Sequence, residues 1–194
     1  MLTLAFASAT AHVARYTLCN NAVFQDAKSQ EECNKISDSA YAEQEKLMKQ
    51  GEMHWHTVGD ASESAILKFC EVRKEAYASQ EGWSAISDST PKFKRVETAR
   101  NSFPLVAEIP FNSKHKYQAS VHFDAASESH FIVMKGAPER VVIRCGQVML
   151  GDEVVPLNEE RIKQFEANNA ALAREGERVL GYCMTQLPKV RVHS

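Results

Sequence analysis

The chain has 194 residues, of which 44% are hydrophobic and 25% charged, and its formal net charge at neutral pH is −2. These totals describe a globular domain that needs no disulfide or structural metal, and the lack of a basic stripe disfavours nucleic-acid binding. No run of about 20 apolar residues is present, so we expect no membrane span within this segment. The five cysteines are dispersed without a CxxC pair, which is typical of reduced cytosolic thiols.

The amino-terminal quarter combines one apolar stretch with a long polar one. Residues 1–11 resemble a signal peptide only weakly, because they lack a basic start and a long apolar core. The apolar period predicts instead a buried, alanine-rich helix over residues 4–24. We expect a loop over residues 26–39 and an exposed helix over 40–49. The His-Trp-His of residues 54–56 has no third ligand nearby, so no metal site is predicted.

A helix is predicted to begin after Gly59, with Asp60 or Ser62 as its cap, and to continue to Arg73. Glu63 lies in its first turn, where a negative charge favours the positive end of a helix. Residues 78–104 contain Gly82 and two prolines, and we expect them to be irregular.

Alternation of apolar and polar residues predicts strands over residues 106–110 and 117–123, joined by a polar turn over 111–116. A third strand is predicted over residues 131–134.

The carboxyl-terminal third alternates helices and strands. We predict a proline-started helix over residues 138–145, a hairpin over 148–155, a helix over 157–175 with Asn158 as its cap, and a closing strand over 179–187. Strands with hairpin-length connections and helices between them favour an α+β fold, in which helices cover an antiparallel sheet.

Two segments carry side chains suited to a nucleotide. Lys135 follows an apolar run and precedes Gly136, which lets backbone approach a ligand closely. Phe111 could stack on a base, Gln118 could read a ring edge and Lys116 could meet a phosphate. Taken singly, each has a plainer interpretation, as a solvated edge lysine or as a hairpin with a core phenylalanine.

Two further segments are weaker alone. Asp60 and Glu63 can be simple helix-capping acids, and Arg178 can be a surface arginine after the end of a helix. A hydrolase that uses Cys183 with His115 is disfavoured, because the chain has no nucleophile elbow and no ordered acidic partner.

Six sequence motifs, taken together and in their order along the chain, favour the binding interpretation of these residues over the plainer ones. The chain resembles the nucleotide-binding (N) domain of P-type cation ATPases, in particular the α subunits of the type IIC sodium/potassium and proton/potassium pumps. The resemblance implies an α+β fold with a twisted antiparallel sheet flanked by helices. It also implies a single domain over residues 1–194, with polar insertions near 26–58 and 78–104 that are longer than expected for animal pumps. The motifs are Asn20-Asn21-Ala22-Val23-Phe24, Gly59-Asp60-Ala61-Ser62-Glu63-Ser64-Ala65, Ile109-Pro110-Phe111-Asn112-Ser113, Lys116-Tyr117-Gln118, Met134-Lys135-Gly136-Ala137-Pro138-Glu139-Arg140 and Gly176-Glu177-Arg178-Val179-Leu180-Gly181.

The resemblance also implies roles for single residues. Phe111 would stack on adenine, Glu63 would accept from the adenine amino group, and Gln118 would hold the base or the ribose side. Arg178 would reach toward the phosphates.

Two lysines would flank the nucleotide in the same way. Lys116 would lie at one side, and Lys135 would form the pocket floor beside Gly136. Three more residues would lie near or behind these: Ser113, Asp60 and Cys183.

The family's phosphorylated-aspartate motif, its magnesium-binding acids and its membrane helices do not occur in this sequence, which therefore looks like an excised domain. We expect it to bind ATP without hydrolysing it, with magnesium ligated mainly outside the chain. Its partners would be the phosphorylation and actuator domains of a pump, and its location the cytoplasmic side of a multi-pass membrane protein. The alternative is an interaction or scaffold module that no longer binds nucleotide.

Overall fold

The computed structural model describes residues 2–5, 17–24, 57–72, 94–151 and 153–188. They fall into two compact units. The larger comprises Met1–Cys19 and Phe103–Ser194, and the smaller comprises Asn20–Ser102. The prediction of a single domain over the whole chain concerns how these units belong together, and it stays a prediction.

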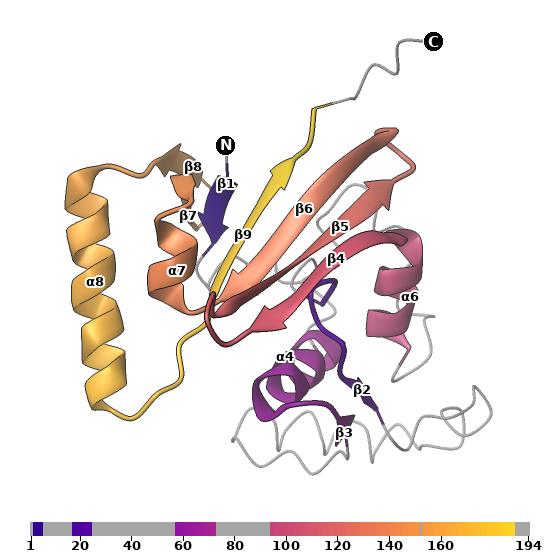
Figure 1. The fold of residues 1–194 in the computed structure, drawn as a ribbon, viewed down its shortest axis with the longest axis horizontal. Coiled ribbons are helices and arrows are strands. Elements are labelled where there is room, and N and C mark those ends of the chain that lie inside the picture. The colour runs from indigo at the N-terminus through magenta and orange to yellow at the C-terminus, as the bar shows by residue number, and fades with distance from the viewer. Residues whose placement is uncertain (1, 6–16, 25–56, 73–93, 152, 189–194) are drawn as a thin grey trace. The chain divides into compact units, whose positions relative to one another are not determined.

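A seven-stranded sheet forms the larger unit, with the strand order β4-β5-β6-β9-β1-β7-β8 (Figure 1). Neighbouring strands are antiparallel except β1 and β7, which are parallel. The strands are β1 (Leu2–Ala5), β4 (Leu105–Asn112), β5 (Tyr117–Asp124), β6 (Ser129–Gly136), β7 (Cys145–Leu150), β8 (Glu153–Pro156) and β9 (Gly181–Gln186).

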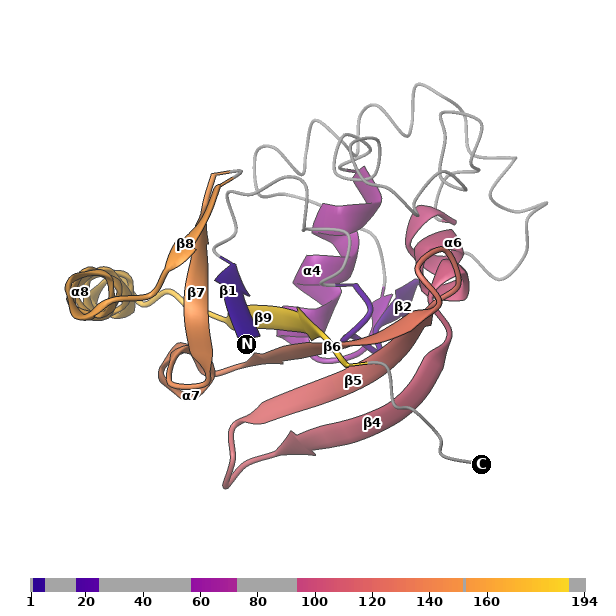
Figure 2. The same ribbon diagram turned by 90° about the horizontal axis from the view of Figure 1, so that it is seen from above.

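Two helices accompany this sheet, α7 (Pro138–Val142) and α8 (Glu159–Arg174). Figure 2 shows both beside β7 and β8 at one end of the sheet, with β4 as the opposite edge. The cap of α8 is Asn158, as predicted, because its side chain accepts a hydrogen bond from the Arg161 N–H. Helix α7 ends at Val142, so the predicted continuation to residue 145 is wrong.

The apolar core of the larger unit lies on the face of the sheet that α7 and α8 cover. Side chains from β5, β6 and β9 meet residues of both helices there, and α7 contacts β6, β9 and α8. Because strand residues alternate between faces, the residues between these core positions point to the other face. The buried core residues are Ala119, Met134, Val141, Val142, Val148, Phe165 and Cys183.

The smaller unit contains a two-stranded antiparallel sheet of β2 (Val23–Phe24) and β3 (Thr57–Val58), with helices α4 (Ala61–Val72) and α6 (Arg95–Ser102). The predicted start of α4 is confirmed, since the Asp60 carboxylate accepts from the N–H groups of Ser62 and Glu63.

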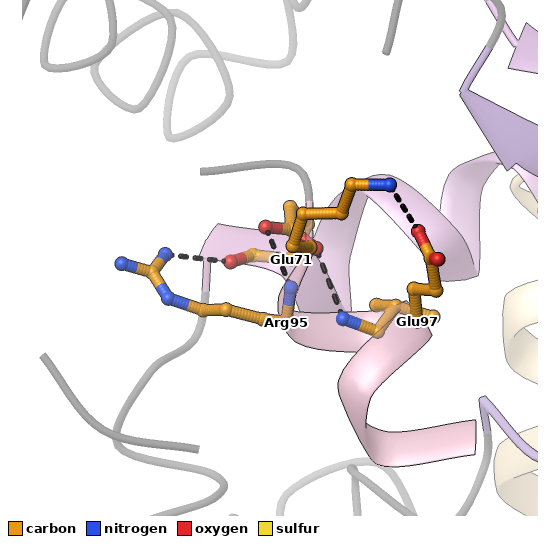
Figure 3. Close-up of polar contacts among 5 residues, drawn as sticks. Glu71, Arg95 and Glu97 are labelled. Atoms are coloured by element: carbon orange, nitrogen blue, oxygen red, sulfur yellow. Dashed lines mark hydrogen bonds and ion pairs between the residues drawn. The ribbon is translucent and has the colours of Figure 1, made fainter. Parts of the chain in front are cut away.

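The first turn of helix α6 is capped by a carboxylate side chain that belongs to helix α4. The buried Glu71 of α4 accepts hydrogen bonds from the backbone N–H groups of Arg95 and Val96, and the Arg95 guanidinium donates to the Glu71 carbonyl oxygen (Figure 3). Lys94 and Glu97 form an ion pair at the surface of the same turn. The N–H groups of a first helical turn lack partners within the helix, so Glu71 supplies what the local sequence does not.

Two of the expected elements are wrong. Residues 4–5 belong to strand β1, residues 17–19 form a turn and residues 23–24 form strand β2, so the helix predicted over 4–24 does not exist in the described residues. Pairing of β1 between β7 and β9 outweighs the local helix preference of alanine. The predicted loop over 26–39, the helix over 40–49 and the histidines of 54–56 lie outside the described residues.

The second error concerns the stretch predicted as irregular, which contains α6. The other strands and helices predicted within the described residues are confirmed, most of them with shifted ends. The fold class is confirmed as α+β, with an antiparallel sheet flanked by helices. None of the helices in the described part of the chain has the length and apolar character needed to cross a bilayer.

Candidate functional site

A row of three polar side chains crosses the sheet face opposite the apolar core. Gln118 of β5 pairs directly with Lys135 of β6, which pairs directly with Tyr182 of β9. Directly paired residues point to the same face, so the three side chains are neighbours. Gln118 and Lys135 are each only 6% exposed. An amide and an ammonium group are therefore buried side by side on one face.

The segment before the smaller unit lies over this row. The Gln118 side-chain amide donates to the carbonyl oxygen of Cys19 (3.4 Å), and the Cys19 thiol lies 3.7 Å from the Gln118 carbonyl oxygen. Burial raises the pKa of the Cys19 thiol, and the charge of Lys135 offsets only part of that rise. Cys19 therefore stays a neutral thiol that fixes Gln118 rather than a nucleophile.

The β4–β5 hairpin carries an exposed aromatic ring on the strand next to that of Gln118. The pairing of β4 with β5 shifts register between Ile109 and Asn112, and Phe111 lies in this irregular stretch with 62% of its surface exposed. Ser113 and Lys116 lie in the exposed turn that follows. Lys116 adopts a positive φ of 60°, and its N–H donates to the Asn112 carbonyl oxygen at 2.6 Å.

Gly136 holds this turn against the start of α7. A Cβ atom added to Gly136 would lie 2.4 Å from the Lys116 carbonyl oxygen, so only glycine permits the observed approach. The same oxygen accepts from the Ala137 N–H at 2.9 Å. The absence of a side chain at Gly136 therefore lets the backbone of Lys116 lie directly against the end of β6, next to Lys135 in the sequence.

The two predicted acids, Asp60 and Glu63, belong to the smaller unit. Asp60 is exposed and caps α4, whereas Glu63 is buried. The Glu63 N–H donates to the Asp60 carboxylate at 2.9 Å, and its carbonyl oxygen accepts from the Asn20 side-chain amide, also at 2.9 Å. Both backbone groups of Glu63 are thus bonded to side chains of other residues, the helix cap Asp60 and the distant Asn20.

The remaining two predicted residues have different surroundings. Arg178 is exposed in the segment between α8 and β9. Cys183 is buried on the opposite face from Gln118 and Lys135, within the apolar core. A hydrogen bond with Cys145, followed by burial, raises the pKa of the Cys183 thiol, which makes it a poor nucleophile.

The structure thus brings together six predicted residues at one end of β4, β5 and β6: Phe111, Ser113, Lys116, Gln118, Lys135 and Gly136. Sequence reasoning missed three polar residues on the same face, namely Ser120, His122 and Tyr182. The signal for two of them was available, because positions 118, 120 and 122 alternate along one strand and therefore share a face.

A large hollow lies elsewhere in the larger unit. Its volume is about 630 Å³, and it lies between α8 and the β7–β8 hairpin. Its walls are mostly apolar and include Val148, Phe165 and Leu172, but none of the predicted binding residues. Size alone therefore does not mark the predicted site, which is a buried polar row on the sheet face opposite the apolar core.

His122 extends the polar row away from Lys135. Its ring nitrogens lie 2.9 Å from the Phe103 carbonyl oxygen and 2.9 Å from the Ser120 hydroxyl, and its ring stacks on Phe131. Burial lowers the pKa of His122, although the Phe103 carbonyl and the charge of Glu108 act in the opposite direction.

We expect acid to destabilise the fold through His122. As the pH falls below about 6.5, the unfolded chain binds a proton at this histidine before the folded chain does, so the free energy of unfolding decreases by at most about 1.4 kcal/mol per pH unit. NMR titration of the His122 ring protons checks the cause, because their midpoint should lie below that of a free histidine. A midpoint at or above it would contradict this prediction.

Comparison with known proteins defines the class of the chain. The sequence profile of the family described as "P-type ATPase, cytoplasmic domain N" matches residues 9–193. Since the match covers nearly the whole sequence, the chain belongs to this family. The sheet flanked by helices agrees with that membership.

Individual relatives indicate which group within this family the chain resembles. The sodium/potassium-transporting ATPase subunit alpha-4 of Rattus norvegicus is 41% identical over 133 residues, which are 68% of this chain and 11% of the relative. The alpha-2 subunit of Bos taurus is 39% identical over 136 residues, or 70% of this chain and 12% of the relative. The resemblance to the type IIC group is thereby confirmed. The chain spans only 11–12% of the length of these curated relatives.

Proposed function

We propose that this chain binds ATP and presents it to the phosphorylation domain of a P-type cation pump, supporting ATP-driven transport of the sodium/potassium type. One observation supports this most strongly. The buried amide of Gln118 and the buried ammonium of Lys135 are direct neighbours on one sheet face, and the neighbouring strand β4 carries the exposed ring of Phe111.

The chemistry of these groups suits the two ends of a nucleotide. A buried ammonium group at the floor of the site carries a positive charge, which attracts an anionic ligand such as a phosphate. An exposed aromatic ring that stacks on a base contributes about 1–3 kcal/mol. Gln118 has both a donor and an acceptor with which to hold the base or the ribose side.

Further contacts follow from the family relationship. Lys116 would flank the nucleotide from the β4–β5 turn, Arg178 would reach the phosphates, and Glu63 would accept from the adenine amino group. Ser113, Asp60 and Cys183 would support these contacts from nearby or behind.

Transfer of a phosphoryl group depends mainly on positioning and charge neutralisation. This chain would contribute positioning, while the aspartate that is phosphorylated and the principal magnesium ligands would belong to other parts of the pump. Its partners would be the phosphorylation and actuator domains, on the cytoplasmic side of a multi-pass membrane protein. By itself the chain should bind ATP with a Kd on the order of 1 mM and should not hydrolyse it.

The Phe111→Ala variant tests the proposal. Loss of the stacking ring should weaken ATP binding by about fivefold or more, since stacking supplies at least 1 kcal/mol. NMR titration of the chain with ATP measures this, and shifts in the wild type should concentrate at Gln118, Lys135 and Arg178. Ile109→Ala is the matched control, because Ile109 is a similarly exposed apolar residue of the same strand (57%) and should leave the affinity unchanged.

Absence of any shift at millimolar ATP in the wild type would overturn the proposal. It would favour an interaction or scaffold module, for which the polar stretches near residues 26–58 and 78–104 are the candidate contact regions. Turnover of ATP by the isolated chain, lost on replacing Cys183, would instead indicate an independent hydrolase.

A further inference from the structure

Asn20 forms a connection in the smaller unit that its sequence position does not reveal. It precedes β2, is only 3% exposed, and uses both ends of its side-chain amide. Its nitrogen donates to the Glu63 carbonyl oxygen at 2.9 Å, and its oxygen accepts from the Ala22 N–H at 2.8 Å. The orientation of the amide is fixed by these partners, because a flipped amide would set donor against donor and acceptor against acceptor.

The segment that carries Asn20 is itself held against the start of α4. A Cβ atom on Gly59 would lie 2.7 Å from the Cβ of Ala22, so the two chain segments touch at backbone distance. The Arg100 guanidinium of α6 donates to the Ala22 carbonyl oxygen at 2.9 Å. Both backbone groups of Ala22 are therefore bonded to side chains, and Asn20 continues this brace to Glu63.

Glu63 is the end point of the brace. Asp60 fixes its N–H and Asn20 fixes its carbonyl oxygen, so the direction in which its side chain leaves the helix is set by two side chains on opposite sides of the residue. Helix capping explains the bond from the Glu63 N–H to Asp60, the residue directly before α4. It does not explain Asn20, which lies 43 residues away along the chain and bonds a carbonyl group that the helix can satisfy internally.

We propose that Asn20 is a positioning residue, which orients Glu63 to accept a hydrogen bond from the exocyclic amino group of adenine. The proposal rests on the proposed function, since it assigns the selectivity of that same site for an adenine base. A residue that only stabilises the unit would affect all nucleotides alike, whereas Asn20 acts on the contact that distinguishes an amino group from an oxygen.

The experiment compares ATP with inosine triphosphate, which carries an oxygen in place of the adenine amino group. Asn20→Asp keeps the acceptor for the Ala22 N–H and removes the donor to Glu63, and Asn20→Ser is a second variant with a smaller side chain. Affinity for ATP should fall by about fivefold, while affinity for inosine triphosphate should change by less than about twofold. Asn21→Asp adds the same charge at an exposed neighbouring position and should keep the wild-type ratio.

A double variant isolates the pair. In a Glu63→Ala background, the further change Asn20→Asp should leave the ratio of the two affinities unaltered, because no side-chain acceptor remains at position 63 for Asn20 to orient. Equal losses for both nucleotides in Asn20→Asp and Asn20→Ser would overturn the inference, as would a wild-type ratio near one. Failure of the wild type to bind ATP would overturn the proposed function itself, and this outcome is visible before any variant is made.

Discussion

Replacing Glu71 with glutamine is expected to lower the free energy of unfolding by about 2 kcal/mol, because a fully buried carboxylate then loses one of two charge-assisted hydrogen bonds. Glu71 is 0% exposed, and its two carboxylate oxygens accept from the N–H groups of Arg95 (3.4 Å) and Val96 (3.1 Å). A glutamine side chain keeps one acceptor and directs an NH₂ group at the other donor.

The charge matters as well as the hydrogen bonds. The N–H groups at the start of a helix carry partial positive charge, and a carboxylate there is favoured over an amide. Helix α6 has only eight residues, so it depends strongly on tertiary contacts for its stability. We therefore expect the first turn of α6 to open before the rest of the smaller unit does.

Chemical denaturation followed by circular dichroism measures the change, and hydrogen exchange at the Arg95 and Val96 amides locates it. Glu97→Gln is the matched control, since Glu97 lies in the same turn but at the surface, paired with Lys94. Exposed ion pairs contribute less than about 1 kcal/mol, so this variant should remain close to the wild type. Equal destabilisation by the two substitutions would refute the role assigned to Glu71.

The same helix shows where prediction from sequence ends. Helices α4 and α8 begin at caps that lie next to them in the sequence, Asp60 and Asn158. Asn158 was predicted, and Asp60 was one of two predicted candidates. The cap of α6 comes from Glu71, 24 residues earlier in the chain, and no local pattern reports it. A polar eight-residue segment without a local cap is therefore read as a loop.

Strand β1 shows a second case in which contacts distant in the sequence determine the local structure. Leu4 belongs to an alanine-rich stretch that favours a helix locally, but its partners are Val148 and Cys183, far away in sequence. Hydrogen bonding on both edges decides the outcome, because a central strand satisfies its backbone groups with two neighbours.

The candidate site was partly predictable for a related reason. The alternation of β5 and β6 could be read from the sequence, whereas their register could not, and only the register makes Gln118 the direct neighbour of Lys135. The ordered motifs supplied what single residues did not, since they identified the family, and the resemblance predicts a site that draws on both segments. The sequence also did not show why position 136 requires glycine, because the reason is its contact with the Lys116 carbonyl oxygen.

Gly136→Ala is expected to have the largest effect of any single substitution proposed for this chain. The added Cβ would lie 2.4 Å from the carbonyl oxygen of Lys116 and 2.7 Å from the Cα of Tyr117. These are backbone atoms of the β4–β5 turn and of the first residue of β5, which cannot rotate away as a flexible side chain can. We expect a loss of about 3 kcal/mol or more in the free energy of unfolding, the upper range for overpacking.

Gly181→Ala supplies a graded control, because Gly181 pairs with Gly136 across β6 and β9 and its added Cβ would meet Pro138 and Val141 at 3.1 Å. Small movements of these neighbours can relieve that contact, so the variant should lose less stability than Gly136→Ala.

The consequence for function follows from what the clash displaces. If Gly136→Ala still folds, Lys116 must move away from Ala137, and the 2.9 Å hydrogen bond between them must lengthen. Amide chemical shifts of Lys116 and Ala137 should then change more than those of residues on α8, and ATP affinity should fall together with them. The contact between Lys116 and Gly136 links the two segments that carry the lysines of the proposed site, Lys116 and Lys135. A folded Gly136→Ala protein with wild-type chemical shifts and wild-type ATP affinity would show that this contact has no part in binding.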